Sequence, residues 1–319
     1  MSTDTKIEWA DKTWGVVLGC KKVGDGPLSG CANCYAIRTV HRLAHNPNPK
    51  IGPLYQGLTR EEDGELDWTG VVRTVPERLT DPLKWRNPAR VFVNSQSDLY
   101  HPAVPVEFLT RVLAVMAVTP RHTYQVLTKR PAVMRKVMAD PSLHGAVDHL
   151  AAGIAHDNDL PYPEDAPWPL PNLHLGVSVE TQECANDRIP ILLDTPAAVR
   201  WISAEPLLGP IDLDFLGGVS ALSRDWAGSA AGGTGCPHPL LDWVVVGCES
   251  GPDARPMDLA WAERIVKDCR YAGTPVLVKQ LGTGPRGKAT QDIDTFPPSL
   301  RVRQYPEVGC PSRVRGWAQ

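Results

Sequence analysis

The feature that most constrains this fold is an alternation of short apolar runs with longer stretches of helical spacing, which begins near residue 68. Each apolar run is rich in β-branched residues and is followed by a few polar residues with Gly or Pro, the pattern of a strand that leads into a helix. The predicted strands cover residues 13–18, 90–94, 123–127, 173–177, 199–203, 243–247 and 275–279. Predicted helices begin near Pro105, Pro131, Thr181 and Asp258, and another follows Cys34.

Successive βα units predict parallel strands, because a crossover helix returns the chain to the same end of the sheet. Continuous apolar runs indicate strands buried on both faces, and this number of units favours a (β/α) barrel or partial barrel over an open sheet. We expect one α/β domain over residues 1–282 and a C-terminal extension over 283–319. Three segments that break the alternation, 46–70, 141–172 and 209–241, are predicted to be loops or lids inserted into the barrel.

Charge and hydropathy exclude several classes of function. The chain has 33 Lys and Arg against 36 Asp and Glu, and a net charge of -3 gives no global field that attracts a phosphate backbone. No stretch approaches the roughly 20 apolar residues of a membrane-spanning helix, and the N-terminus lacks the pattern of a secretory signal. We therefore expect a soluble, cytoplasmic protein with no membrane contact. In that reducing compartment a cluster among the eight cysteines indicates a metal or redox site rather than disulfides.

Three cysteines form such a cluster between a predicted strand and a predicted helix. Cys20, Cys31 and Cys34 stand in the pattern G-C-x10-C-x2-C-Y-A. Three thiolates are one short of a closed structural zinc site, but they suit a four-iron cluster that leaves one iron open. Two alternatives remain from spacing alone: a zinc site completed by His41, His45 or His101, and three unrelated buried thiols.

Polar side chains follow nearly every predicted strand, at positions that share one mouth in an α/β barrel. Several carboxylates facing a common cavity with Lys and Arg would be costly to bury without a ligand, so the pattern favours a polar-ligand site. For any single residue a helix cap or a surface charge is the alternative, as for Asp98 before the next helix. The strand-end residues are Asn94, Ser95, Gln96, Ser97, Asp98, Thr128, Lys129, Arg130, Ser178, Glu180, Glu205, Cys248, Glu249, Ser250, Lys279 and Gln280.

Seven blocks of the sequence resemble, in order, a phage-associated family named after phage gene products 37 and 68, whose function is unknown. The blocks are CxxCYA, VFVNSQSDLYHPAVP, YQVLTKRP, LGVSVE, ISAEPLLGPIDL, WVVVGCESGPDARPM and VLVKQLG, between about Lys6 and Gly282. That family is in turn similar to spore photoproduct lyase and other radical S-adenosylmethionine (SAM) proteins. The resemblance therefore implies a radical-SAM-like barrel that holds a 4Fe-4S cluster and SAM.

The resemblance also implies residue roles. Cys20, Cys31 and Cys34 would bind the cluster, Tyr35 would lie near the adenine of SAM, and Ser97 and Asp98 would contact its amino group. Two features depart from the family patterns. The usual radical SAM spacing is C-x3-C-x2-C, whereas the first pair here is C-x10-C. Cys248 stands where the family block GGES has a Gly, and this change is either neutral or provides a hydrogen-atom donor. The predicted cofactor-binding set is Tyr35, Asn94, Ser95, Ser97, Asp98 and Ser178.

The implied activity is reductive cleavage of SAM to start hydrogen abstraction from a substrate, with a nucleobase or nucleotide favoured, in modification or repair. The implied partners are an electron donor such as flavodoxin or ferredoxin, a nucleotide or nucleic-acid substrate, and a three-Cys-motif partner protein. Two alternatives stay open: a zinc-stabilised nucleic-acid- or partner-binding protein on a degenerate barrel, and a metal-free barrel hydrolase or lyase. The candidate catalytic residues are Lys129, Glu180, Glu205, Glu249 and Lys279, with Arg130 as a further candidate for holding substrate.

Overall fold

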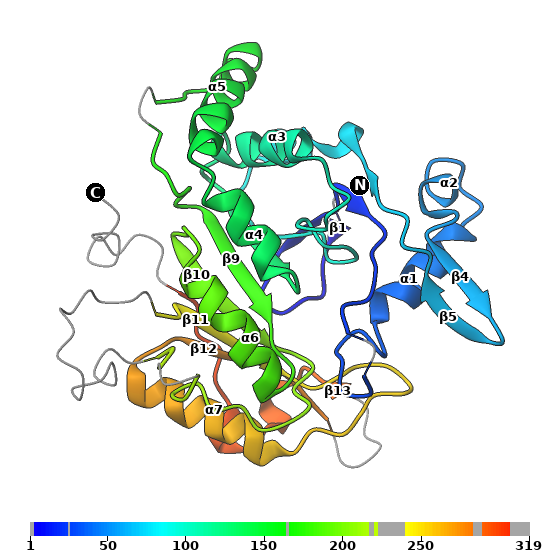
Figure 1. Ribbon diagram of the computed structural model, residues 1–319, viewed down its shortest axis with the longest axis vertical. Helices are drawn as coiled ribbons and strands as arrows, with labels where there is room; N and C mark the ends of the chain where they lie inside the picture. Colours follow the sequence, from blue (N-terminus) through cyan, green and yellow to red (C-terminus); the bar gives the residue numbers. More distant parts are fainter. Residues whose placement is uncertain are drawn as a thin grey trace. The chain divides into compact units, whose positions relative to one another are not determined.

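The computed structural model describes residues 3–24, 26–163, 166–216, 220–222, 240–282 and 289–306. The chain divides into two compact units, Met1–Leu173 and His174–Gln319. Each unit combines parallel strands with flanking helices, so the predicted α/β class is confirmed (Figure 1). The strand pairings of the described residues close no barrel. No helix in the described part of the chain is long and apolar enough to cross a membrane.

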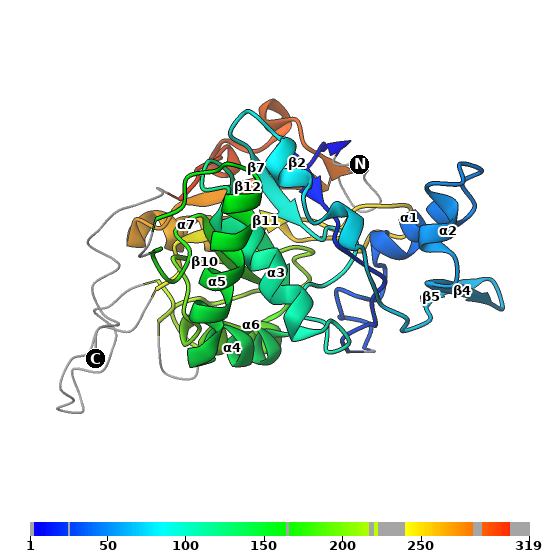
Figure 2. The same ribbon diagram turned by 90° about the horizontal axis from the view of Figure 1, so that it is seen from above.

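The first unit is built on a short sheet in which β2 pairs parallel with β7, and β7 pairs parallel with β8. An antiparallel β1 extends the sheet on the far side of β2. Helices α3, α4 and α5 belong to the same unit as this sheet, and α3 packs along α5 (Figures 1 and 2). These elements are β1 (Thr3–Asp4), β2 (Lys12–Trp14), β7 (Arg90–Val93), β8 (Thr123–Thr128), α3 (Val106–Ala117), α4 (Pro131–Met138) and α5 (Pro141–Asp157).

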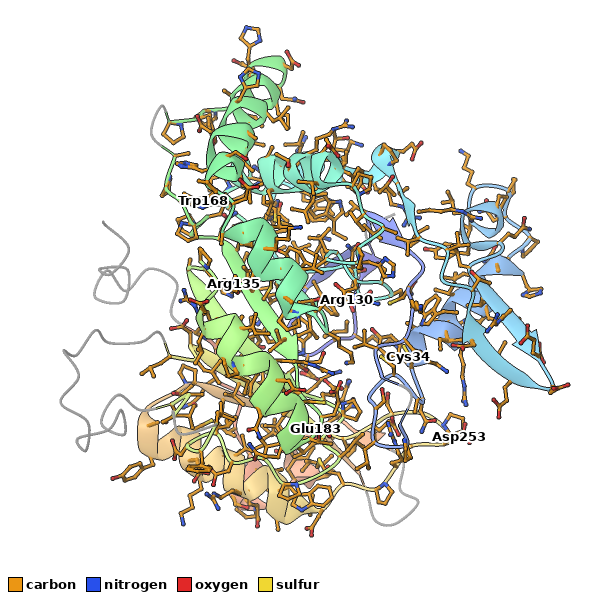
Figure 3. All side chains as sticks on the ribbon, in the orientation of Figure 1. Cys34, Arg130, Arg135, Trp168, Glu183 and Asp253 are labelled. Carbon is orange, nitrogen blue, oxygen red and sulfur yellow. The ribbon has the colours of Figure 1, made fainter. Side chains whose placement is uncertain are left out.

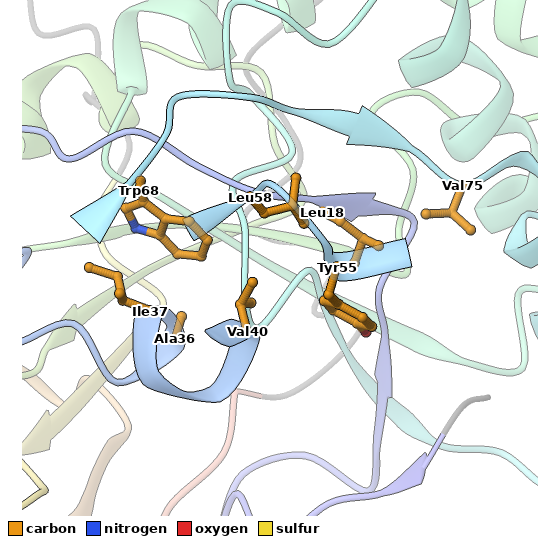
Figure 4. Packing of buried hydrophobic residues seen from close by; sticks show 8 residues of the cluster. All are labelled: Leu18, Ala36, Ile37, Val40, Tyr55, Leu58, Trp68 and Val75. Carbon is orange, nitrogen blue, oxygen red and sulfur yellow. The ribbon is translucent and has the colours of Figure 1, made fainter. Parts of the chain in front are cut away.

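A smaller group of elements in the same unit surrounds the cysteine segment. Helices α1 and α2 lie beside the hairpin β4–β5 in both views (Figures 1 and 2), and β3 pairs antiparallel with β6. Their apolar side chains form one cluster, shown in Figure 4: Leu18, Ala36, Ile37, Val40, Tyr55, Leu58, Trp68 and Val75. The elements are β3 (Val17–Leu18), α1 (Tyr35–Ala44), α2 (Gly52–Tyr55), β4 (Thr59–Glu62), β5 (Glu65–Trp68), β6 (Arg73–Thr74) and the 3-10 turns Pro76–Arg78 and Asp81–Lys84.

The second unit carries four parallel strands in the order β9-β10-β11-β12, with a short antiparallel β13 on β12. Every residue of β9, β10 and β11 is buried, as the continuous apolar runs predicted. The bounds are β9 (Leu173–Ser178), α6 (Gln182–Leu193), β10 (Val199–Ala204), β11 (Trp243–Gly247), α7 (Leu259–Ala272), β12 (Val276–Gly282), β13 (Ala289–Thr290) and the 3-10 turns Ile293–Thr295 and Pro298–Leu300.

Six of the seven predicted strands are confirmed to within three residues, and the seventh is divided. The predicted strand at 13–18 ends as β2 at Trp14, and the chain resumes as β3 at Val17. The cause is local: the backbone N–H groups of Val16 and Val17 both donate to the side-chain oxygen of Asn94, at 3.0 Å each, instead of to a neighbouring strand.

The predicted helix starts are also confirmed, because α3, α4, α6 and α7 begin at or directly after Pro105, Pro131, Thr181 and Asp258. Thr181 and Asp258 are N-caps whose side chains accept hydrogen bonds from the backbone N–H groups of Cys184 and Ala260.

Two of the three predicted loop segments contain regular structure, and the loop prediction is wrong over those helices and strands. Segment 46–70 contains α2 and the β4–β5 hairpin, whose turn residues Asp63 and Gly64 both have positive φ, as a tight two-residue hairpin requires. Segment 141–172 contains α5, which Asp140 caps by accepting from Ser142 N–H. Of segment 209–241, residues 217–219 and 223–239 lie outside the described residues, as do 283–288 and 307–319 of the predicted extension.

Candidate functional site

The three clustered cysteines lie on the segment that joins β3 to α1, residues 19–34, which we call the Cys loop. Cys34 is the residue directly before α1, and Cys20 follows β3 by one residue. Both pack against the apolar cluster of Figure 4, which fixes the two ends of the loop. Within the loop, Val23 N–H donates to the Cys31 sulfur at 3.5 Å, and the Ser29 hydroxyl donates to Val23 C=O at 3.1 Å. All three thiols are free and partly exposed.

Burial is the main influence on the pKa values of Cys20 and Cys34. Burial raises the pKa of Cys20 to about 11, with a further contribution from Asp98; Arg130 opposes the shift, and Cys31 and Cys34 add to it. Burial, followed by the charge of Cys31, also raises the pKa of Cys34, against the influence of Lys129. Cys20 and Cys34 therefore hold their protons at neutral pH, and a metal group would have to displace those protons in order to bind.

The donor set fits a four-iron cluster in kind and in number. Three sulfurs on one loop would supply three ligands of such a cluster, and Arg130 and Lys129, whose charges act on Cys20 and Cys34, would offset its negative charge. In the described part of the chain no group of three or more His, Cys, Asp or Glu side chains already has the geometry of a metal site. The loop therefore carries three cysteine ligands, but their side chains are not already arranged around a metal position.

The three histidines considered as a fourth zinc ligand have other contacts. His41 Nδ1 lies 3.5 Å from the Thr59 hydroxyl, and His45 Nδ1 lies 2.9 Å from the carbonyl oxygen of His41. His101 Nδ1 accepts from Ala103 N–H at 3.1 Å, and burial together with Arg130 lowers its pKa. Within the described residues none of the three completes a site with the cysteines.

The turn after β7 holds most of the predicted cofactor-binding residues, and its polar groups bond to the Cys loop and its flanks. Asn94 accepts from Val16 and Val17, and the Ser97 hydroxyl donates to Val17 C=O at 2.6 Å. The Tyr35 hydroxyl donates to Ser95 C=O, and Gly19 forms a parallel bridge with Ser97. These bonds dock the loop on the end of β7.

Asp98 is the centre of a buried network at the same turn. Its carboxylate accepts from the Thr128 hydroxyl at 2.8 and 2.9 Å, from Tyr100 N–H at 3.0 Å and from Lys129 N–H at 3.3 Å. It also accepts from Arg130 Nη1 at 3.0 Å. Asp98 was predicted as a SAM ligand with a helix cap as its alternative, but α3 begins after Pro105, so the carboxylate caps no helix in the structure.

In the second unit, two of the predicted catalytic carboxylates form ion pairs with arginines. Glu180 is fully buried, and its Oε2 accepts from Arg188 Nη1 at 2.9 Å; the same nitrogen donates to Ser178 C=O at 2.7 Å. Glu249 Oε2 accepts from Arg255 N–H at 2.8 Å and from Arg255 Nε at 3.0 Å, while its Oε1 accepts from Arg255 Nη2. Both carboxylates are thus held by guanidinium groups that stay charged at all accessible pH.

The remaining pair of the second unit joins β10 to β12. Lys279 Nζ lies 2.5 Å from Glu205 Oε1, and Glu205 also packs over Gly247, where a Cβ would lie 3.1 Å from its carboxyl carbon. The neighbouring Cys248 is 2% exposed. Burial, followed by the charge of Glu205, raises the pKa of the Cys248 thiol to about 12. This thiol is therefore neutral. It lies beside the Glu205–Lys279 pair, which is the only Lys–Glu pair among the described strand-end residues of the second unit.

The structure thus groups the predicted residues by unit, with Lys129 and the cysteines in the first and Ser178, Glu180, Glu205, Glu249 and Lys279 in the second. The sequence pattern did not indicate the two arginines, Arg188 and Arg255, that neutralise Glu180 and Glu249. Arg188 lies eight residues after Glu180 on α6 and Arg255 six residues after Glu249. Figure 3 shows the side chains, with Cys34 and Arg130 labelled in the first unit.

Comparison with known proteins gives one family assignment. The sequence profile of a family described as "Protein of unknown function (DUF5131)" matches residues 4–300, a range that includes the whole Cys loop and all the strand-end residues. No curated protein and no solved structure matches the chain.

Proposed function

Because the chain belongs to the DUF5131 family, whose function is unknown, we propose a function from its site: it is a radical SAM enzyme that binds a 4Fe-4S cluster through Cys20, Cys31 and Cys34. The observation that carries the proposal is the placement of three free thiols on one loop that is docked on the end of the parallel strand β7. The strands then serve as a partial barrel of the radical-SAM type.

When bound, the cluster and SAM supply one-electron reductive cleavage of a sulfonium, which starts hydrogen abstraction from a substrate. Three cysteines leave one iron without a protein ligand, which is the position that SAM needs. The loop shields the sulfurs partly from water, because Cys20 and Cys34 pack against the apolar cluster. Tyr35, half exposed beside Cys34, offers an aromatic face for the adenine.

Proton transfer in the second unit falls to Lys279 and Glu205 rather than to Glu180 or Glu249. A proton can move between an ammonium and a carboxylate at 2.5 Å, whereas a guanidinium does not release one. Glu180 and Glu249 hold Arg188 and Arg255 and so fix the segments that follow β9 and β11. Lys129, near Cys34, is a candidate for contact with an anionic substrate.

The substrate class that we propose is a nucleobase or nucleotide, modified or repaired after hydrogen abstraction. The net charge of -3 favours a nucleotide or a locally bound strand over broad contact with a duplex. The proposal also includes an external electron donor such as flavodoxin or ferredoxin and, as a further partner, a three-Cys-motif protein.

Anaerobic reconstitution with iron and sulfide, followed by reduction in the presence of SAM, tests the activity. The expected result is formation of 5'-deoxyadenosine and methionine by the wild-type chain and by Cys184→Ala, which removes a partly exposed free thiol on α6. Cys31→Ala should lose this product. Cleavage of SAM that persists when all three loop cysteines are replaced would overturn the proposal. A colourless protein with one zinc ion per chain would instead support a zinc-stabilised binding protein.

A further inference from the structure

The carboxylate of Asp98 has no capacity left for another donor. Its Oδ1 accepts from Tyr100 N–H and the Thr128 hydroxyl, and its Oδ2 accepts from the same hydroxyl, from Lys129 N–H and from Arg130 Nη1. A carboxylate offers about four lone-pair sites. The side chain is 8% exposed, so its hydrogen bonds are formed inside the protein. Asp98 is thus fully used in holding the turn after β8.

Arg130 is the residue that Asp98 holds, and it reaches the Cys loop. With Nη1 on Asp98, its Nη2 donates to Lys21 C=O at 2.7 Å, and Nη1 also lies 4.0 Å from the Cys20 sulfur. The guanidinium is 12% exposed. A planar, preorganised fork can bridge a carboxylate and a carbonyl in this way, whereas an ammonium cannot reproduce both directions. The contact joins residues more than 100 positions apart in the sequence.

We propose that Asp98 and Arg130 are positioning residues for the Cys loop, and that this clamp both fixes Cys20 and places a permanent positive charge beside it. The inference rests on the proposed function for the identity of the group that the loop carries, but not for the clamp itself. In this proposal Ser97 and Asp98 hold the loop, through Val17 and Arg130 respectively, and do not contact the amino group of SAM.

The charge has a consequence for the loaded protein. Reduction of an iron-sulfur cluster adds negative charge, and a fixed cation near one ligand sulfur stabilises that reduced form. Arg130 should therefore raise the reduction potential of a cluster on Cys20, Cys31 and Cys34. A residue with a merely structural role would not change the potential through its charge.

Hydrogen exchange of the full metal-free chain tests the clamp without any cluster. In Arg130→Gln, peptides covering residues 19–34 should exchange about tenfold faster than in the wild type, because the hydrogen bond from the guanidinium to Lys21 C=O is lost. Thr128→Val should act in the same direction, because it removes a donor to the Asp98 carboxylate that holds Arg130. Lys136→Gln removes an exposed positive charge from α4, the helix that Arg130 precedes, and is the matched control, with unchanged exchange. Unchanged exchange in Arg130→Gln and Thr128→Val would overturn the clamp.

The reduction potential of the reconstituted chain tests the electrostatic role. Arg130→Gln should shift the potential to more negative values than Lys136→Gln, and Arg130→Lys should restore the potential while its loop still exchanges faster than in the wild type. Equal potentials in Arg130→Gln and Lys136→Gln would overturn this role. If the wild-type chain binds no iron but the variants show the predicted faster exchange, the proposed function is refuted and the clamp is supported. If the wild-type chain binds the cluster but the variants exchange at the wild-type rate, the clamp is refuted and the proposed function is supported.

Discussion

Lys279 Nζ lies 2.5 Å from Glu205 Oε1, with the two side chains only 15% and 16% exposed. The pair differs from its neighbours Glu180–Arg188 and Glu249–Arg255 because its cation is an ammonium, which can give up a proton, and not a guanidinium. Most of the charge at the strand ends of the second unit is therefore structural, and one pair has the chemistry of an acid and a base.

Breaking that pair should cost more than removing it. Lys279→Met leaves the Glu205 carboxylate without its cation, and we expect a loss of about 2–4 kcal/mol in the free energy of unfolding. The double variant Lys279→Met with Glu205→Leu should recover most of this loss, because no unpaired charge remains. Urea unfolding of the single and double variants measures the difference. A single variant as stable as the wild type would show that the pair is solvated in solution.

Asn94 should be difficult to replace, because it combines two local requirements. Its φ of 60° lies in the left-handed region, and its side-chain oxygen accepts from two buried backbone N–H groups, those of Val16 and Val17. We expect Asn94→Ala to destabilise the chain by about 2–4 kcal/mol, since two donors lose their partner and Ala disfavours this conformation. Asn94→Gly should cost less, because Gly accepts the φ. Equal losses in thermal or urea unfolding for Ala and Gly would contradict the conformational part of this explanation.

Gly176 should not tolerate a side chain. A Cβ at this position of β9 would lie 2.4 Å from Cε2 of the buried Trp201 indole on the neighbouring β10. Gly176→Ala must displace that ring, and we expect a loss of more than about 2 kcal/mol in the free energy of unfolding. Gly209→Ala is the matched control, because a Cβ there meets no atom within 4 Å. Similar unfolding curves for the two variants would contradict the packing of Trp201 on β9.

His174 should make stability depend on pH. Burial lowers the pKa of this histidine from 6.5 to about 4, and neither ring nitrogen has a hydrogen-bond partner among the described residues. Between these values the unfolded chain binds a proton that the folded chain does not, so stability falls as the pH falls from about 6.5 toward 4. At pH 5 the loss is about 2 kcal/mol.

Urea unfolding of the wild type and of His174→Phe between pH 7.5 and 5 measures this contribution. The variant should lose less stability over that range, by about 2 kcal/mol. His149→Gln, which removes an exposed histidine on α5, is the matched control and should retain the wild-type dependence. Parallel curves for the wild type and His174→Phe would show that His174 takes up a proton in the folded chain as readily as in the unfolded one.

The sequence predicted strands well where they are buried on both faces, and it predicted helix starts well where a capping residue marks them. The runs that became β9, β10 and β11 are buried on both faces, and Thr181 and Asp258 are caps that can be recognised from the residues alone. It failed at the β4–β5 hairpin, because the charged residues of β4 face solvent and resemble a loop. It also failed at α5, because the prolines from Pro161 to Pro171 indicated a loop, whereas the helix that packs along α3 ends before them at Asp157.

For the site, the sequence indicated which strand ends carry polar residues but not what those residues contact. Arg130 and Lys21 are distant in sequence, and their contact depends on how the loop folds back. Glu180 and Glu249 were expected to face a ligand, yet arginines from α6 and from the segment before α7 neutralise them. Strand-end polarity can thus arise from internal ion pairing, which spacing alone does not distinguish from ligand binding.

The iron and sulfide content of the anaerobically reconstituted chain shows whether Cys20, Cys31 and Cys34 bind a 4Fe-4S cluster. We expect about four irons and four sulfides per chain for the wild type and for Cys184→Ala. We expect a large loss of both in each of the variants Cys20→Ala, Cys31→Ala and Cys34→Ala. Iron content that is equal in the wild type and in the triple variant, or a wild-type chain that binds a single zinc and no sulfide, would contradict this expectation.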